Sequence, residues 1–300
     1  MENDVKTNSP RAWLLAARPK TLSAAAVPVM VGSALAAVDL GADFQVLPCV
    51  LCFLFAFIMQ IDANFINDYF DFRKGSDRTD RLGPERACAQ GWITPRAMQG
   101  GIVVTTLLAC VAGLPLLWIG GWELLLVGAV CVLFAFLYTL GLSYRGWGDV
   151  LVLVFFGWVP VCFTYYLQTG VWTWASVVCA TACGLVIDTL LMVNNFRDRD
   201  QDRISGKRTV VVRWGARAGS TGYLWLGFLS CVGCLSLVAG GYLWAAILPQ
   251  FYLLLHIRTW QLMVSLHQGR ALNRVLGMTA RNIFLFGLLL TVGLLLQCLG

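Results

Sequence analysis

Apolar residues occupy most of the chain in long stretches that are separated by shorter polar segments. Nine such stretches lie at 21–38, 46–68, 98–119, 122–140, 150–168, 174–196, 220–240, 242–258 and 282–299. Their length of roughly 17 to 25 residues is what a helix needs to cross the hydrocarbon core of a bilayer. The pattern predicts an all-α integral membrane protein, a single domain over residues 1–300 with nine transmembrane helices.

Composition and charge favour the same fold class. The chain is 58% hydrophobic and 13% charged, whereas soluble proteins average about 25% charged residues. With nine spans and a cytoplasmic N-terminus, all 22 Lys and Arg residues fall on the cytoplasmic side, and the opposite side holds Asp39, Asp43 and Glu123. The positive-inside rule therefore predicts a cytoplasmic (inner) membrane protein whose C-terminus lies on the opposite side. The net charge of +6 then reflects orientation, and no nucleic-acid partner is expected.

Two clusters of polar residues interrupt this apolar sequence, and each joins the end of a predicted helix to a basic loop, 72–97 or 197–219. Residues three, four and seven apart share one face of a helix. Two such faces carry Asn64, Asn67, Asp68 and Asp71 on the first helix and Asn194, Asn195, Asp198 and Asp202 on the second. Both helices run toward the cytoplasm, so both faces lie at helix C-termini, where the helix dipole attracts cations.

Several carboxylates packed together repel one another unless a metal ion or basic groups offset their charge. Mg²⁺ usually takes one or two carboxylates together with waters and phosphate oxygens, so two facing clusters could hold a pyrophosphate between two Mg²⁺ ions. The predicted metal ligands are Asp68, Asp71, Asp198 and Asp202. The basic residues that follow the clusters are candidates for phosphate contact, namely Lys74, Arg78, Arg81, Lys207 and Arg208. Since the sequence contains neither GxxxxGK[ST] nor GxGxxG, nucleotide binding through those loops is not supported.

The sequence around both clusters resembles the motifs of UbiA-type intramembrane prenyltransferases. The first motif (64–81) lies in and before NDYFDFRKGSDRTDRLGP at 67–84, and the second (194–208) lies in NNFRDRDQDRISGKRT at 194–209. RPKTL at 18–22 is similar to the N-terminal signature of the family, and GWGDVLVLVFFG at 146–157 is similar to its fifth helix. The loop strings resemble the branch that prenylates 1,4-dihydroxy-2-naphthoate in menaquinone biosynthesis.

The resemblance implies that the nine helices surround a central cavity. There, with Mg²⁺, an isoprenoid chain would pass from a polyprenyl pyrophosphate to an aromatic acid, in this branch with loss of CO₂. It implies that the active site faces the cytoplasm, that Arg18, Lys20 and the asparagines of both clusters bind substrate, and that Tyr138 is catalytic and lies near the allylic cation. Many relatives have a Lys where this chain has Leu142. Arg145 is the next basic residue along the chain and is the candidate to bind substrate in its place. The product's lipid tail would leave into the bilayer.

Two further acids are candidates for contact with the aromatic substrate. Asp149 begins the fifth span, where it either contacts the aromatic acid or caps the helix. Asp188 lies on the same stripe as Asn195 and Asp202, roughly 10 Å deeper than Asn195 at 1.5 Å per residue, and is expected to face the cavity.

Two other functions are consistent with parts of the sequence. One is prenylation of a different acceptor such as 4-hydroxybenzoate, against which the loop strings argue by resemblance. The other is a membrane transporter, but transporters place carboxylates near the midplane of the bilayer, whereas the acids here lie at one surface. The sequence predicts neither the length of the isoprenoid chain nor the oligomeric state, and it indicates no obligate protein partner.

Overall fold

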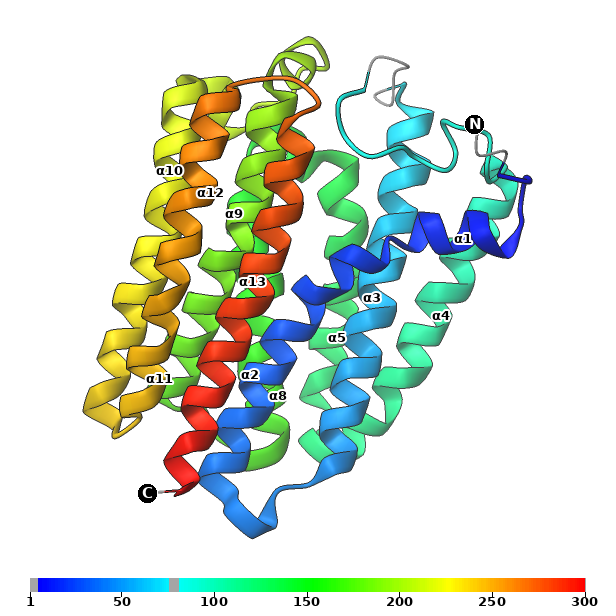
Figure 1. The fold of residues 1–300 in the computed structure, drawn as a ribbon. Coiled ribbons are helices and arrows are strands. Elements are labelled where there is room, and N and C mark those ends of the chain that lie inside the picture. Colours follow the sequence, from blue (N-terminus) through cyan, green and yellow to red (C-terminus); the bar gives the residue numbers. More distant parts are fainter. Residues whose placement is uncertain (1–4, 76–80, 300) are drawn as a thin grey trace.

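A computed structural model describes residues 5–75 and 81–299, and the regular elements of this part of the chain are all helical (Figure 1). Eight helical segments in it are long and apolar enough to cross a membrane. The helices that form these segments are α1 (Pro10–Ala17) with α2 (Leu22–Leu40), α3 (Val46–Arg73), α4 (Pro95–Gly120), α5 (Glu123–Leu137) with α6 (Ser143–Arg145), α7 (Gly148–Val152) with α8 (Val159–Thr169), α9 (Trp174–Ile204), α10 (Val210–Leu235) and α13 (Leu272–Leu295).

The segment expected as the eighth span, 242–258, is divided into three elements. These are α11 (Leu243–Ile247), a 3₁₀ turn (Leu248–Phe251) and α12 (Tyr252–Leu266). Pro249 lies at the start of the 3₁₀ turn, where its missing N–H and its ring disfavour a continuous α-helix. With 15 residues, α12 alone is shorter than the roughly 20 residues that span a bilayer, so the ninth crossing stays a prediction.

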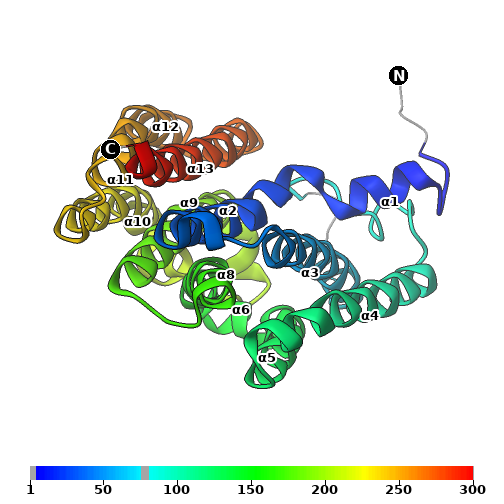
Figure 2. The same cartoon turned by 90° about the horizontal axis from the view of Figure 1, so that it is seen from below.

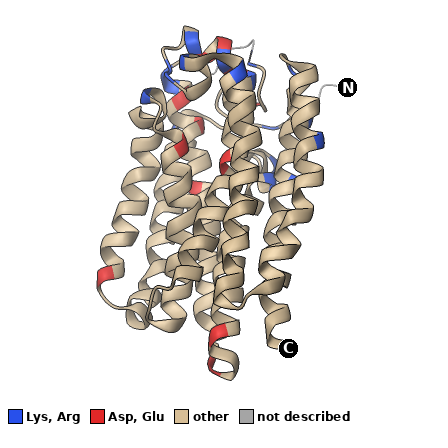
Figure 3. Cartoon of the chain, turned by 90° about the vertical axis from the view of Figure 1, so that its left-hand side faces the viewer, with Lys and Arg blue, Asp and Glu red and all other residues tan. Residues whose placement is uncertain are grey.

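The charged residues are separated along the bundle. In the part of the chain that the structure describes, Lys and Arg gather toward the end at which α3 and α9 finish, and acidic residues alone mark the other end (Figure 3). We call the first end the basic end. Helix α1 lies crosswise to the bundle beside α3, and the chain's C-terminus lies at the end opposite the basic end (Figure 1). This separation agrees with the pattern in the sequence, while the side of the membrane that each end faces stays a prediction.

Helix α9 is the central helix of the bundle. In its apolar segment 72% of the residues are buried, against 22% in that of α3, and it packs against α2, α8, α10 and α13 (Figure 2). A π-helical turn at Leu153–Trp158 lies directly on α9: a Cβ built on Gly157 would be 2.6 Å from the carbonyl oxygen of Ala180 and 2.9 Å from the Cα of Gly184. Small residues thus let the fifth span approach the helix that carries the second acidic motif.

A second π-helical turn, Tyr138–Leu142, joins α5 to α6. Such turns widen a helix locally and are frequent at functional sites. This one lies at the basic end, and the first residue after α3, Lys74, reaches it: the Lys74 Nζ donates hydrogen bonds to the carbonyl oxygens of Thr139 at 2.7 Å and Leu140 at 2.9 Å. The fourth span is thereby fixed to the end of α3, beside the first acidic motif.

Candidate active site

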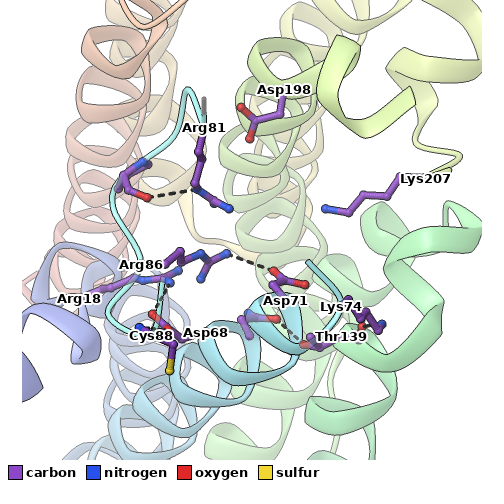
Figure 4. A network of polar contacts seen from close by, with 12 residues as sticks. Arg18, Asp68, Asp71, Lys74, Arg81, Arg86, Cys88, Thr139, Asp198 and Lys207 are labelled. Carbon is purple, nitrogen blue, oxygen red and sulfur yellow. Dashed lines mark hydrogen bonds and ion pairs between the residues drawn. The ribbon is translucent and has the colours of Figure 1, made fainter. Parts of the chain in front are cut away.

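The acidic ends of α3 and α9 meet at the basic end of the bundle (Figure 4). Asp71, in the last turn of α3, and Asp202, near the end of α9, share their cations. Both Lys207 and Arg81 interact electrostatically with each of the two carboxylates. The Lys207 Nζ lies 3.3 Å from Asp202 Oδ1. The two acidic motifs, far apart in the sequence, therefore contribute to one polar site.

Two arginines pair with further carboxylates of this site. Arg86 Nη2 lies 3.4 Å from Asp71 Oδ2. Arg197 donates from Nε and Nη2 to the two carboxylate oxygens of Asp198 at 2.7 Å and 2.6 Å, and its Nη1 donates to Asn273 Oδ1 at 2.9 Å. Each carboxylate of the site thus has a basic partner, as carboxylates held close together require.

Asp68 is oriented differently from the other predicted metal ligands. It is fully buried, and its Oδ2 and Oδ1 accept hydrogen bonds from the backbone N–H groups of Ala87 and Cys88, each at 2.8 Å. Arg18 Nη2 lies 3.7 Å from Asp68 Oδ2. Since both oxygens are engaged by the loop after α3, this geometry gives no support to the prediction that Asp68 is a metal ligand.

The predicted asparagines fall into three environments. Asn64 Nδ2 donates to the Ala17 carbonyl at 3.0 Å and to Thr21 Oγ1 at 3.1 Å, so its amide joins α3 to the N-terminal segment rather than to the acids. Asn67 accepts a hydrogen bond from the Thr139 hydroxyl, next to the Lys74 contact. Asn194 and Asn195 lie about one turn before Asp198 on α9, half-buried and buried respectively.

Two lysines flank the ring of Tyr144. Its centroid lies 4.3 Å from Lys74 Nζ and 5.3 Å from Lys207 Nζ, within the range of cation–π attraction. Burial lowers the pKa of Lys74, against the opposing pull of Asp71. Burial also lowers the pKa of Lys207, but the carboxylates of Asp202 and Asp71 outweigh it and the net shift is upward. Lys207 therefore stays protonated at neutral pH.

The other predicted cations are less uniform. Arg81 donates from Nε to the Pro84 carbonyl at 3.2 Å and interacts with the acids as described. The side chains of Lys20, Arg145 and Arg208 are exposed, and the contacts at Arg145 and Arg208 are made by backbone: the Arg208 N–H donates to the Tyr144 carbonyl at 2.8 Å, and the Arg145 carbonyl accepts from Arg213 at 3.1 Å. Arg78 lies outside the described residues.

Tyr138 connects the acidic site to two further carboxylates. Its phenol interacts electrostatically with Asp149 and Asp188 as well as with Asp71 and Asp202. Asp188 is 4% exposed on α9. One oxygen of Asp149 and one of Asp188 are buried with no hydrogen-bond partner among the described residues. Buried oxygens without partners are rare in folded proteins, so these two acids are suited to meeting a polar group of a bound molecule.

Comparison with known proteins decides the family. The model of the UbiA prenyltransferase family matches residues 25–286, which include both acidic motifs. The chain belongs to the UbiA prenyltransferase family.

Curated relatives from this family cover most of the chain. A protein of Escherichia coli strain K12 named 1,4-dihydroxy-2-naphthoate octaprenyltransferase is 39% identical over 78% of this chain and 79% of its own. A protein of the same name from Mycobacterium tuberculosis is 35% identical over 75% of this chain and 77% of its own. The UbiA prenyltransferase domain-containing protein 1 homolog of Drosophila melanogaster is 33% identical over 73% of this chain and 62% of its own.

Solved structures of the UbiA family share the fold. The apo structure of a UbiA homolog from Aeropyrum pernix K1 superimposes with a TM-score of 0.71 at 16% identity and covers 92% of this chain and 98% of its own. A UbiA homolog from Archaeoglobus fulgidus, bound to DMAPP and Mg²⁺, superimposes with a TM-score of 0.61 at 14% identity and covers 93% of this chain and 99% of its own.

Three residues of the UbiA-type site were not among those predicted from the sequence: Arg86, Arg197 and Tyr144. Arg86 follows Asp71 by 15 residues in an irregular loop, so no helical periodicity points to it. Arg197 lies inside the second motif directly before Asp198, and this adjacency is the only signal of its role in the sequence. Tyr144 lies within cation–π distance of both lysines and follows the π-helical turn, which the apolar pattern of the fourth span does not reveal.

The donor atoms of the site fit Mg²⁺ in kind. Asp71, Asp198, Asp202 and the Asn67 carbonyl supply hard oxygen ligands, which Mg²⁺ prefers. Among the described residues, no three His, Cys, Asp or Glu side chains are already close enough to hold a metal ion, and Arg86, Arg197 and Lys207 pair with the carboxylates. The same cations can contact phosphate oxygens once the carboxylates bind another cation.

Proposed function

We propose that this chain transfers a polyprenyl group from a polyprenyl pyrophosphate to 1,4-dihydroxy-2-naphthoate, with release of CO₂ and pyrophosphate, to give demethylmenaquinol. The observation that carries the proposal is the 39% identity to the E. coli 1,4-dihydroxy-2-naphthoate octaprenyltransferase over 78% of this chain and 79% of that one. The site supports it independently, since acids from both motifs gather around cations that can bind a pyrophosphate.

The donor side of the reaction takes place at the acidic site. Asp71, Asp198 and Asp202, with Asn67, would hold two Mg²⁺ ions, and Asp68 is left out of this set because of its hydrogen bonds to the loop. Mg²⁺ neutralises charge that develops on a leaving pyrophosphate. Lys207, Arg81 and Lys74 stabilise the same charge by hydrogen bonds as the C–O bond of the allylic donor breaks. The side chains of Lys20 and Arg208 are exposed and would attract the anionic donor from solution.

The acceptor side lies deeper, around Tyr138. The buried oxygens of Asp149 and Asp188 lack partners among the described residues, and the two hydroxyl groups of the naphthoate are hydrogen-bond donors that would satisfy them. The ring carbon that bears the carboxylate attacks the allylic carbon. A C–C bond forms between the two carbons. The bond between the ring and its carboxylate then breaks, CO₂ leaves, and the electron pair of the broken bond restores the aromatic ring. The phenol of Tyr138 lies between the two regions, where it can stabilise the allylic cation.

The chain's setting follows from its charges. With its basic end in the cytoplasm of a cell with an inner membrane, the site takes both substrates from the cytoplasmic side. The isoprenoid product then enters the surrounding bilayer, and the reaction requires no protein partner.

The proposal is tested by a prenyl-transfer assay on the detergent-purified chain with a polyprenyl pyrophosphate and Mg²⁺. 1,4-Dihydroxy-2-naphthoate and 4-hydroxybenzoate are compared as acceptors, each with and without EDTA. We expect prenylated naphthoquinol with equimolar CO₂ and no product after chelation. Product from 4-hydroxybenzoate alone would move the chain to another acceptor branch, and no product from either acceptor in folded protein would contradict the proposal.

A further inference from the structure

The hydrogen bonds of Asp68 identify a second kind of acid in the first motif. Its two oxygens accept from two successive backbone N–H groups, those of Ala87 and Cys88, at 2.8 Å each. Arg18 Nη2 lies 3.7 Å from one of them. Hydrogen bonds to an ionised acceptor are stronger than neutral ones, and this carboxylate is fully buried. Asp68 therefore fixes the loop after α3 to the body of α3.

The point of attachment is the start of a turn. The Gln90 N–H donates to the Arg86 carbonyl at 3.0 Å, and the Trp92 N–H donates to the Ala87 carbonyl at 2.9 Å. The N–H groups of Ala87 and Cys88 therefore lie at the beginning of this turn, where the backbone offers them to an acceptor from elsewhere. Asp68 acts there as a cap residue acts on a helix, and it fixes the backbone directly after Arg86.

Arg86 is directed into the acidic site by this attachment. Only 8% of its surface is exposed, and Figure 4 shows its side chain reaching from the loop toward Asp71, where Nη2 lies 3.4 Å from Oδ2. A guanidinium carries five N–H donors in a planar fork that matches phosphate oxygens. A buried arginine at the acid that shares Lys207 and Arg81 with the second motif is placed to contact an anion bound there.

We propose that Arg86 binds the pyrophosphate of the prenyl donor and that Asp68 is a positioning residue, which holds Arg86 in the site through the backbone of Ala87 and Cys88. This inference rests on the proposed function for the identity of the anion. It separates the two acids of the first motif: Asp71 faces the substrate, whereas Asp68 faces the loop.

The experiment compares the purified full-length chain with D68N, R86Q, R86K and the double variant D68N/R86Q, with E85Q as the matched control. Glu85 is exposed in the same loop, next to Arg86. Hydrogen exchange of the 86–90 segment is measured in EDTA, so that no metal contributes. Binding of inorganic pyrophosphate is measured by calorimetry at saturating Mg²⁺, and the Mg²⁺ dependence of binding is measured separately.

We expect D68N to raise exchange at Ala87 and Cys88 without changing it elsewhere, because Asn offers one acceptor and turns an NH₂ toward an amide N–H. D68N and R86Q should each weaken pyrophosphate binding by about tenfold or more, with R86K in between and the E85Q control like wild type. The double variant should be no weaker than R86Q alone. The Mg²⁺ concentration for half-maximal binding should not change in D68N.

Several results would overturn the proposal. One is unchanged exchange in D68N together with a raised Mg²⁺ requirement, as a metal ligand would give. Another is a double variant in which the two effects multiply, because Asp68 would then act independently of Arg86. If D68N does not fold, R86Q decides, and binding equal to wild type contradicts the proposal. If the wild-type chain binds pyrophosphate but makes no prenylated naphthoate, the proposed function is contradicted, while the roles of Arg86 and Asp68 in pyrophosphate binding are not.

Discussion

Individual carboxylates of this chain differ in what surrounds them, and their partners define their roles. Asp198 is held by Arg197 through two hydrogen bonds, while Asp62, fully buried on α3, accepts from the hydroxyls of Thr105 at 2.5 Å and Thr106 at 3.0 Å. Asp188 has one buried oxygen without a partner in the described part of the chain. Ion-paired, hydroxyl-bonded and partly unsatisfied acids thus occur within one bundle.

The first prediction concerns the second acidic motif. Asp198→Asn removes a carboxylate from the acidic site and should lower kcat by about a hundredfold or more, the usual loss when a group that stabilises developing charge is removed. Asp200→Asn, two residues away on an exposed position, is the control and should behave like wild type. Both variants are compared in the prenyl-transfer assay after their folding has been checked by size-exclusion chromatography. Near-normal turnover of Asp198→Asn would contradict the site assignment.

The second prediction separates the acceptor region from the donor region. Asp188→Asn should raise KM for 1,4-dihydroxy-2-naphthoate by about tenfold, since leaving a buried polar group unsatisfied costs roughly 1–3 kcal/mol, and should leave KM for the polyprenyl pyrophosphate unchanged. Asp62→Asn replaces an equally buried acid away from the site and should change neither KM. A rise in both KM values for Asp188→Asn would show that Asp188 does not act on the acceptor specifically.

Helical periodicity predicts which residues share a face but not which way each side chain turns. The spacing of Asp68 and Asp71 places both at the end of α3, and they do lie there. They differ because of the loop: Ala87 and Cys88 bring N–H groups to Asp68 from about 20 residues along the chain, which the periodicity of α3 does not predict. The same limit applies to Arg86, whose contact with Asp71 depends on the conformation of the loop.

At the scale of elements, the helices were predictable where apolar residues form one continuous run. The helix expected at 174–196 is part of α9, Trp174–Ile204, and its extension carries the acidic motif beyond the apolar run. The π-helical turns at Tyr138–Leu142 and Leu153–Trp158 were not predictable, because they keep the apolar composition of the spans. The helix break near Pro249 is explained by this proline, which disfavours a continuous α-helix. The apolar pattern did not predict the break, because the run 242–258 is apolar on both sides of the proline.

The third prediction tests the contact between the fifth span and α9. Gly157→Ala should destabilise the protein by about 1–3 kcal/mol, the usual cost of adding atoms to a packed interface, because the new Cβ would lie 2.6 Å from the Ala180 carbonyl oxygen. Activity should fall as well, since Asp149 and Asp188 lie on the two elements that this contact joins. Gly128→Ala on α5 adds the same atom where nothing lies within 4 Å and should be neutral. Thermal unfolding in detergent measures both, and equal midpoints would contradict the close packing.

At the scale of the molecule, the distribution of charge predicts how the bundle is oriented in the membrane. Lys and Arg of the described residues gather at the end that carries the acidic site, and the C-terminus lies at the other end (Figures 1 and 3). Termini at opposite ends favour an odd number of crossings, although eight segments qualify by length and composition. The segment from α11 to α12 would supply the ninth.

The fourth prediction tests this orientation in cells. A fluorescent protein fused to the N-terminus should fluoresce, because it folds in the cytoplasm, and alkaline phosphatase fused to the C-terminus should be active, because it folds outside. The reciprocal pair of fusions is the control and should be silent. Fluorescence from a C-terminal fusion would mean an even number of crossings, with α11 and α12 lying at one surface.

The pairing of every carboxylate in the acidic site with a basic side chain has a consequence for how the protein takes up its substrate. Before any substrate binds, Arg86, Arg197 and Lys207 pair with the acids. The charges of the site therefore largely cancel, and the site attracts a free divalent ion only weakly. In the proposed reaction, uptake would then be an exchange of counter-ions, in which a guanidinium or ammonium leaves a carboxylate only when an anion is there to receive it. Such a site favours the metal and the pyrophosphate arriving together, and it protects the carboxylates from cations that come alone.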